Sequence, residues 1–193
     1  MVKTRLLFTV LATFALLAGT SRAADLPRKA PELSISSTDG KRILLSQYRG
    51  KVVAMCFILT TCPHCQKTIG YLIKDQTEFG PRGFQVLASA IQEGAAVAVP
   101  GFVKSFNTNF PVGFNEPAVA IDFMQHPPML IPHMPLLAFV DRQGNIRAQY
   151  EGDNNQFFSD QQEQNLRNQI QALLKEGEQT KKPAPKKTVA SKN

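Results

Sequence analysis

Two cysteines separated by two residues, in the segment Cys62-Pro63-His64-Cys65, constrain this chain more than any other feature. A nearly all-apolar run, 51–59, leads directly into the pair, and an apolar pattern of helical spacing follows it. The sequence therefore places the two cysteines where a buried strand ends and a helix begins. Proline suits the first turn of that helix, because its missing N–H would have no helical partner there.

This placement favours redox chemistry at the cysteine pair. The N-terminus of a helix carries free N–H groups and a partial positive charge, which stabilise a thiolate at Cys62. His64 adds a second positive charge when it is protonated. An accessible thiolate with a second thiol three residues later is the arrangement that thiol–disulfide exchange uses. We therefore predict that Cys62 and Cys65 are catalytic and that Pro63 and His64 tune the thiolate.

A structural role for the pair is the alternative, either as an inert disulfide or as half of a zinc site. Such zinc sites need a second cysteine pair or two histidines at fixed spacing. The chain has three cysteines in all, and His126 and His133 do not have zinc-finger spacing. The redox interpretation is therefore preferred. The third cysteine, Cys56, lies inside the apolar run and is interpreted as a small buried hydrophobic residue.

Residues 1–23 have the pattern of a secretory signal peptide. Lys3 and Arg5 precede an apolar stretch over 6–17, and small residues precede a cleavage position after Ala23. The apolar stretch is shorter than the roughly 20 residues that a membrane-spanning helix needs, so a cleaved signal is favoured over a membrane anchor. Export would place the chain in the periplasm, where oxidising conditions give a cysteine pair partners to oxidise or reduce.

The rest of the chain is predicted to form one domain over 24–176, followed by a disordered basic tail over 177–193 with almost no apolar content. The net charge of +7 comes from the two ends of the chain. Between Asp25 and Glu178, fourteen basic residues face fifteen acidic ones, which gives a net charge of −1. A basic nucleic-acid-binding surface is therefore not indicated.

Apolar patterns and turn signals along the domain predict an α/β fold. Strands and helices alternate, and this order favours a sheet with parallel strands. The predicted elements are a hairpin around Asp39-Gly40, a strand at 51–59, a helix from the cysteine pair to about Glu78, a strand at 84–91, a helix from Pro100 to about Asn107, a strand at 110–114, a helix at 116–124, a hairpin over 136–151, and a last helix that Ser159 opens through a capping box with Gln162.

Taken together, these motifs resemble the TlpA/ResA-type thiol–disulfide oxidoreductases, exported relatives of thioredoxin in the AhpC/TSA-redoxin group. The likeness covers 30–152. The resemblance implies a thioredoxin-like fold, with a central mixed β-sheet flanked by helices and an N-terminal β-hairpin extension. Its markers are Asp39-Gly40-Lys41, Leu45-Ser46-Gln47-Tyr48-Arg49-Gly50-Lys51, Phe57, Cys62-Pro63-His64-Cys65, Pro135, and Phe139-Val140-Asp141-Arg142-Gln143-Gly144-Asn145-Ile146.

The resemblance also implies a function and a set of site residues. The chain would exchange a Cys62–Cys65 disulfide or dithiol with protein thiols and disulfides, using no cofactor beyond this redox-active disulfide. A membrane-bound electron donor or acceptor is a further expected partner, and we expect a monomer. Met134-Pro135 would be a cis peptide facing the active site. Thr61, Met134 and Pro135 would then bind the substrate polypeptide.

Three positions depart from the family pattern. The family usually has tryptophan before the first cysteine, where this chain has Thr61 and no tryptophan at all. Thioredoxin keeps a buried acid six residues before that cysteine, and Cys56 occupies this position here, so a carboxylate that could take the proton from Cys65 is missing there. The dipeptide Pro63-His64 resembles the oxidant DsbA. The direction of electron flow therefore stays open.

A copper-binding module or metallochaperone is the alternative function. Soft ligands such as methionine suit Cu(I). The copper ligands would be Cys62, Cys65 and His133, if Pro135 faces Cys62. Convergence of His133 and a methionine on Cys62 would distinguish this function from a simple capping loop. The candidate loop, 124–134, contains Met124, His126, Met129, His133 and Met134.

Overall fold

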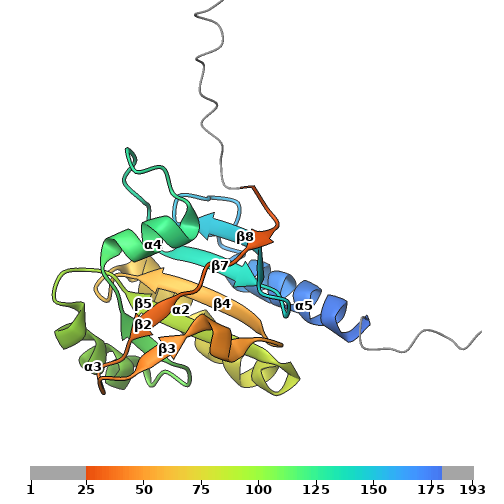
Figure 1. Cartoon of the computed structure of the whole chain (residues 1–193), viewed down its shortest axis with the longest axis horizontal. Coiled ribbons are helices and arrows are strands. Elements are labelled where there is room, and N and C mark those ends of the chain that lie inside the picture. The colour runs from red at the N-terminus through yellow and green to blue at the C-terminus, as the bar shows by residue number, and fades with distance from the viewer. Residues whose placement is uncertain (1–24, 180–193) are drawn as a thin grey trace, which may run out of the picture.

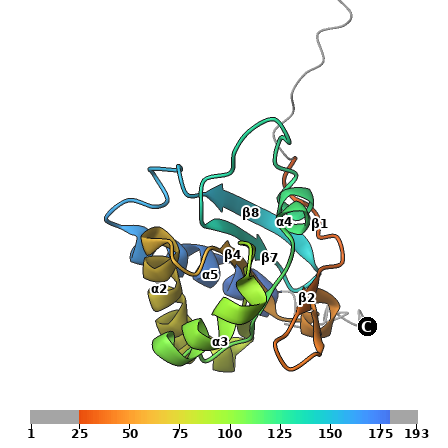
Figure 2. The ribbon, with the colours of Figure 1, turned by 90° about the vertical axis from the view of Figure 1, so that its left-hand side faces the viewer.

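The computed structural model describes residues 25–179 of the chain. The predicted signal peptide and the predicted tail beyond residue 179 lie outside the described residues. The described residues form one eight-stranded mixed sheet with α-helices on both of its faces (Figures 1 and 2). In chain order the elements are β1 (Arg28–Lys29), β2 (Ser34–Ser36), β3 (Arg42–Leu44), the 3-10 helix η2 (Leu45–Tyr48), β4 (Val52–Ile58), α2 (Pro63–Phe79), the 3-10 helix η3 (Gly80–Arg82), β5 (Phe84–Ala90), α3 (Ala95–Phe106), β6 (Val112–Phe114), α4 (Pro117–Met124), β7 (Leu136–Val140), β8 (Asn145–Glu151) and α5 (Gln162–Gln179).

The sheet is built around β4, the apolar run that precedes the cysteine pair. The strands lie in the order β1-β8-β7-β4-β5-β6-β2-β3. β4 pairs in parallel with β5 and antiparallel with β7, and all seven of its residues are buried. Continuous apolar sequence is what a strand covered on both faces requires. The predictions of an α/β class and of a central mixed sheet are therefore confirmed.

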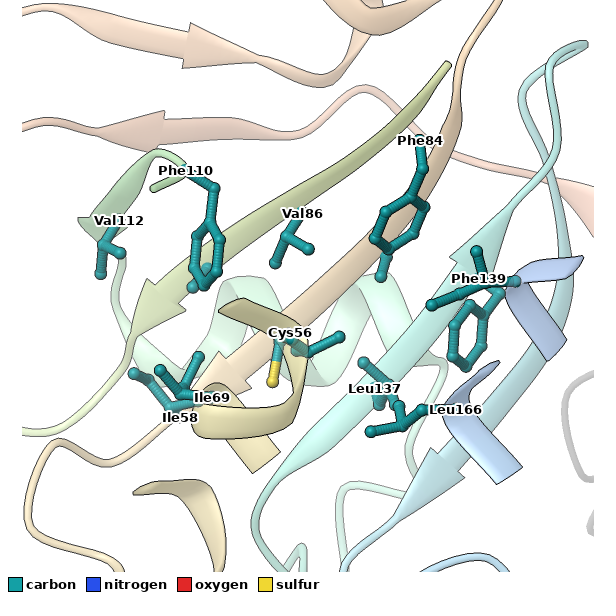
Figure 3. Close-up of a cluster of buried hydrophobic side chains, with 14 of the residues drawn as sticks. Cys56, Ile58, Ile69, Phe84, Val86, Phe110, Val112, Leu137, Phe139 and Leu166 are labelled. Carbon is teal, nitrogen blue, oxygen red and sulfur yellow. The ribbon is translucent and has the colours of Figure 1, made fainter. Parts of the chain in front are cut away.

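Successive residues of β4 point to opposite faces and enter two separate cores. On one face, Cys56 and Ile58 pack with apolar residues of α2, α3 and α5. On the other face, Met55 and Phe57 pack with α4 and the N-terminal hairpin. Figure 3 shows the Cys56 sulfur inside the first of these clusters. Cys56 has no exposed surface, which confirms its interpretation as a core residue.

β2 and β3 form the predicted N-terminal hairpin. Ile35 lies opposite Ile43, and Ile35 is buried in the second core. The turn needs Gly40, whose φ of 83° is in the left-handed region that favours glycine. β2 also pairs with β6, through Ser36 and Phe114, so the hairpin extends the sheet at its edge.

The predicted start of α3 at Pro100 was wrong, because the helix begins five residues earlier, at Ala95. The backbone N–H of Ala98 already donates to the Gly94 carbonyl, and Pro100 lies inside the helix. Proline is a strong start signal in sequence because it lacks the N–H that an interior position uses. Burial of Ala95 and Val99 against the sheet extends the helix past that signal.

The predicted capping box at the start of α5 was also wrong. The helix begins at Gln162, and the Ser159 hydroxyl accepts a hydrogen bond from the Gln161 N–H. The side chain of Gln162 does not return to Ser159 but donates to the buried Thr68 hydroxyl on α2, at 2.7 Å. A buried hydroxyl needs a partner more than an exposed helix end does. The helix continues to Gln179, past Gly177 where the tail was expected to begin.

Candidate active site

Cys62 and Cys65 lie at the junction that the sequence predicted. β4 ends at Ile58, a turn follows in which the Cys62 N–H donates to the Leu59 carbonyl at 3.1 Å, and Cys62 is the N-cap residue of α2. Pro63 is the first helical residue, where its missing N–H costs nothing. The pair therefore occupies the positive end of a seventeen-residue helix.

The two thiols of the pair have different surroundings. Cys62 is half-buried, and Cys65 is fully buried in the first turn of α2. Burial raises the pKa of the Cys65 thiol to about 12; a backbone hydrogen bond from Leu59 opposes this rise, and the adjacent Cys62 thiol adds to it. Burial also raises the pKa of the Cys56 thiol well above its ordinary value, with Cys65 as the second cause. Of the three thiols, Cys62 is the one that a partner can reach.

Thr61 precedes Cys62, and His64 lies between the two cysteines in the first turn of α2. Both residues are exposed. The His64 carbonyl accepts a hydrogen bond from the Thr68 hydroxyl, at 2.9 Å, and Thr68 in turn accepts from Gln162. The first turn of α2 is therefore fixed from the side of α5, while the His64 ring is free to face solvent.

Met134 and Pro135 approach the same edge of the sheet. β7 begins at Leu136, which lies opposite Phe57 near the end of β4. The preceding Met134–Pro135 peptide bond is cis. Pro135 is buried, and Met134 is half-buried and packs against both cores. The topology therefore brings this segment to the edge at which β4 leads into Cys62.

The loop that the copper alternative requires does not gather its candidate ligands. His126 is buried, with Nε2 3.3 Å from Glu151 Oε2, and His133 is exposed, with Nδ1 3.4 Å from Asp153 Oδ2. Met124 has no exposed surface, whereas Met129 is 92% exposed. In residues 25–179, no group of three or more histidine, cysteine, aspartate or glutamate side chains could hold a metal ion. The structure thus gives the copper alternative no support.

One set of polar residues, at the turn that precedes Cys62, was not predicted from the sequence. Thr60 is buried, and the side chains of Gln66 and Gln92 bind its polar groups. Gln92 lies thirty residues from Cys62 and follows the neighbouring strand β5. The one signal in the sequence is that a polar residue, Thr60 or Gln92, lies two positions after the end of each of two buried strands, and parallel pairing brings these two ends to the same edge.

Comparison with known proteins gives a consistent family. The Redoxin family profile matches residues 27–170. The thiol-disulfide oxidoreductase ResA of Bacillus subtilis is 34% identical over 93 residues, which are 48% of this chain and 51% of that protein. ResA of Bacillus cereus is 26% identical over 129 residues, 67% of this chain and 71% of that protein. The chain thus aligns with about half the length of the first relative.

Solved structures share the fold. A thiol:disulfide interchange protein of the thioredoxin family from Chlorobium tepidum superposes with a TM-score of 0.64 at 23% identity, over 79% of this chain and 99% of that one. One from a Bacteroides species superposes with a TM-score of 0.62 at 18% identity, over 80% and 93%. These likenesses confirm the predicted thioredoxin-like fold.

Proposed function

The chain belongs to the redoxin family, and from this membership and its cysteine pair we propose that it is an exported thiol–disulfide oxidoreductase acting on proteins. One observation carries the proposal: a half-buried Cys62 caps the N-terminus of α2, and a buried Cys65 lies in the first turn behind it. An accessible thiol at a positive helix end with a shielded thiol behind it suits two-step disulfide exchange.

The exchange proceeds through a mixed disulfide. The Cys62 thiolate attacks one sulfur of a partner disulfide, and the other partner sulfur leaves as a thiolate. Cys65 then loses its proton and attacks the Cys62 sulfur, so the partner's first sulfur leaves as a thiolate and is protonated. The Cys62–Cys65 disulfide remains, and two electrons have passed to the partner. The same steps in reverse oxidise a partner dithiol.

Thr61, Met134 and Pro135 are the proposed substrate-binding residues. Thr61 is exposed beside Cys62, and Met134–Pro135 enters at the same edge of the sheet. Pro135 has no N–H to donate to a partner. We therefore propose that a partner backbone forms its hydrogen bonds with the N–H and carbonyl groups of Met134. A protein partner is favoured by the exposed apolar residues earlier in this loop, since such patches mark protein contacts. These are Met129, Leu130 and Ile131, which are 92%, 62% and 85% exposed.

We further propose the setting in which the exchange occurs. The sequence pattern of residues 1–23 supports a signal peptide that is cleaved after Ala23 and directs a single domain to the periplasm. Because α5 continues to Gln179, this domain spans 24–179, and the basic segment follows it. Among residues 25–179, no helix is both long and apolar enough to cross a membrane. We propose a monomer that exchanges with protein thiols and with a membrane-bound electron donor or acceptor; the near-neutral domain gives no reason to expect a nucleic-acid partner.

Selective alkylation tests the assignment of the reactive thiol. Limiting iodoacetamide added to the reduced protein at mildly acidic pH is expected to label Cys62 almost alone. Cys65 is buried with a pKa of about 12, and Cys56 has no exposed surface. Peptide mass spectrometry gives the distribution of the label over the three cysteines. Predominant labelling of Cys65 or Cys56 would overturn the assignment.

Replacing His64 with alanine is expected to make the disulfide less oxidising. The exposed His64 side chain lies next to the helix end, and it adds a positive charge when it is protonated. That charge favours the reduced form of the pair, and alanine removes it. A shift of about 30 mV corresponds to about 1.4 kcal/mol for a two-electron couple, which equilibration with glutathione buffers resolves. Lys67→Ala, which removes an exposed charge one turn further along α2, is the matched control. Equal potentials for His64→Ala and the native protein would show that the helix end alone sets the potential.

A further inference from the structure

The turn between β4 and α2 contacts both sulfur-bearing residues of the pair. The Leu59 carbonyl accepts the Cys62 N–H at 3.1 Å. The Leu59 backbone also lowers the pKa of the Cys65 thiol by hydrogen bonding, against the larger effect of burial. The first contact fixes the entry of Cys62 into the helix. The second supplies a donor to a thiol that must become a thiolate although it is buried. The Cys62 contact involves only its backbone, whereas the Cys65 contact involves the sulfur itself, so the position of this turn bears most directly on the second step of the exchange.

Thr60, the next residue of this turn, is held by two glutamine side chains. Its N–H donates to Gln92 Oε1 at 3.3 Å, and its hydroxyl accepts from Gln92 Nε2 at 2.5 Å. Its carbonyl accepts from Gln66 Nε2 at 2.9 Å. Every polar group of Thr60 is thus bonded to an amide side chain, and the residue is only 7% exposed.

Gln92 reaches Thr60 because the parallel pairing of β5 with β4 continues beyond the strands. The Ile91 N–H donates to the Ile58 carbonyl at 3.0 Å, which places Gln92 beside the turn. A glutamine carboxamide has an oxygen that accepts and an NH₂ group that donates, and both groups of Gln92 bond to Thr60. A truncated side chain at this position would leave the buried Thr60 N–H and hydroxyl without these partners, and a buried unpaired group is costly. The turn would then move toward solvent and take Leu59 with it.

We propose that Gln92 is a positioning residue for disulfide exchange, which acts by holding Thr60 so that the Leu59 backbone stays against the Cys65 thiol. The inference rests on the proposed function of the cysteine pair. The step that depends on it is resolution of the mixed disulfide. There Cys65 gives up its proton, its sulfur forms a bond with the Cys62 sulfur, and the bond between Cys62 and the partner breaks. The partner sulfur carries away the electron pair and is protonated.

A chromogenic aromatic disulfide separates the two steps. Its attack by Cys62 releases one coloured thiolate, and resolution by Cys65 releases the second, so the two phases report on different cysteines. For Gln92→Ala we expect the second phase to slow by about tenfold, as the loss of buried hydrogen bonds suggests, while the first phase changes less than about twofold. We also expect the pH profile of the second phase to move to higher pH, because the Cys65 thiolate loses its backbone donor.

Four further variants separate positioning from general packing. Gln85→Ala removes a half-buried glutamine from β5 whose side chain bonds to Gln76 and Val86, away from the turn, and it should leave both phases unchanged. Thr60→Val removes the hydroxyl at constant shape and should slow the second phase, whereas Thr60→Ser should keep the native rate. Thr60→Val combined with Gln92→Ala should slow resolution no more than Gln92→Ala alone, since both changes break the same contact.

The outcomes distinguish this inference from the proposed function. A native protein that releases no coloured thiolate, or one equivalent only, would contradict disulfide exchange itself. A native protein that shows both phases, together with a Gln92→Ala protein of native second phase, would overturn the positioning role alone. Equal slowing in Gln85→Ala would also overturn it. If Gln92→Ala fails to fold, Thr60→Val decides by the same measurement, and native kinetics in that variant would overturn the inference.

Discussion

Replacing Cys65 with serine is expected to trap the partner of this chain as a covalent complex. Cys62 remains half-buried at the N-terminus of α2 and still attacks a partner disulfide. Serine is close to cysteine in size, so the buried site behind Cys62 keeps its packing. Its hydroxyl is too weak a nucleophile to break the mixed disulfide. The native protein resolves this intermediate, whereas the variant should accumulate it almost completely.

Non-reducing electrophoresis of extracts from the compartment of the protein measures this accumulation. The complex should disappear with dithiothreitol, and the partner can then be identified by mass spectrometry. Cys62→Ser is the matched control, since it removes the attacking thiol and keeps Cys65. We expect no complex from it. A Cys65→Ser protein that stays free of adducts would contradict the assignment, and adducts that persist in Cys62→Ser would point to Cys56 instead.

The centre of the fold and the place of the cysteine pair could be predicted because local patterns determine them. The apolar run of β4 has no polar residue that could face solvent, so it must lie in the middle of a sheet. Pro63 fixes the first turn of α2 directly after Cys62. The Asp39-Gly40 turn fixes the hairpin and its register, with Ile35 opposite Ile43. Each of these signals lies within a few residues of the feature that it specifies.

The errors have a common physical cause, which is packing between segments that are distant in sequence. Burial of Ala95 and Val99 extends α3 past Pro100, the position where a local rule starts the helix. Gln162 leaves the predicted capping box for Thr68, ninety-four residues away. Propensity and capping are each worth about 1 kcal/mol, and burial of one apolar side chain outweighs either of them.

The contact between Thr60 and Gln92 was not predicted for the same reason, since it joins segments that are distant in sequence. Gln92 meets Thr60 only because β4 and β5 pair in parallel and end at the same edge. In the loop of 124–134 the converse holds, because residues close in sequence diverge in space. Met124 enters the core while Met129 is exposed to solvent, so proximity along the chain does not by itself bring these side chains together.

The second large effect concerns Asp75, a buried carboxyl on α2. Its side chain is 1% exposed, and Oδ1 lies 3.3 Å from an Arg167 nitrogen of α5. Within the described residues, Oδ2 is buried without a hydrogen-bond partner. Burial raises the pKa of Asp75 from 3.8 to about 6; Arg167 opposes this, and Glu78 and Glu163 add to it. Arg167 is shared, because its other terminal nitrogen binds Glu78 at 2.7 Å.

The raised pKa makes the contribution of Asp75 to stability fall as pH rises. In the unfolded chain the carboxyl titrates near its ordinary value of 3.8, whereas the folded protein keeps the proton up to about pH 6. Between these values the folded state binds more protons than the unfolded state, so the free energy of unfolding decreases with pH. The rise from 3.8 to about 6 corresponds to about 3 kcal/mol of stability, which is fully present below about pH 4 and lost above about pH 7.

Replacing Asp75 with asparagine should therefore stabilise the protein at neutral pH and change little at acid pH. Asparagine resembles the protonated carboxyl at every pH, so it removes the cost of ionising a buried group. Urea unfolding at a series of pH values gives the free energy of unfolding of Asp75→Asn minus that of the native protein. This difference should rise by up to about 3 kcal/mol between about pH 4 and pH 7. Taking the difference cancels the titration of the other carboxyls.

Asp122→Asn, which removes an exposed carboxylate from α4, reports any general effect of net charge. A difference for Asp75→Asn that stays flat across this range would show that Arg167 compensates the buried charge in full, and that the polar contact between α2 and α5 carries no cost at neutral pH.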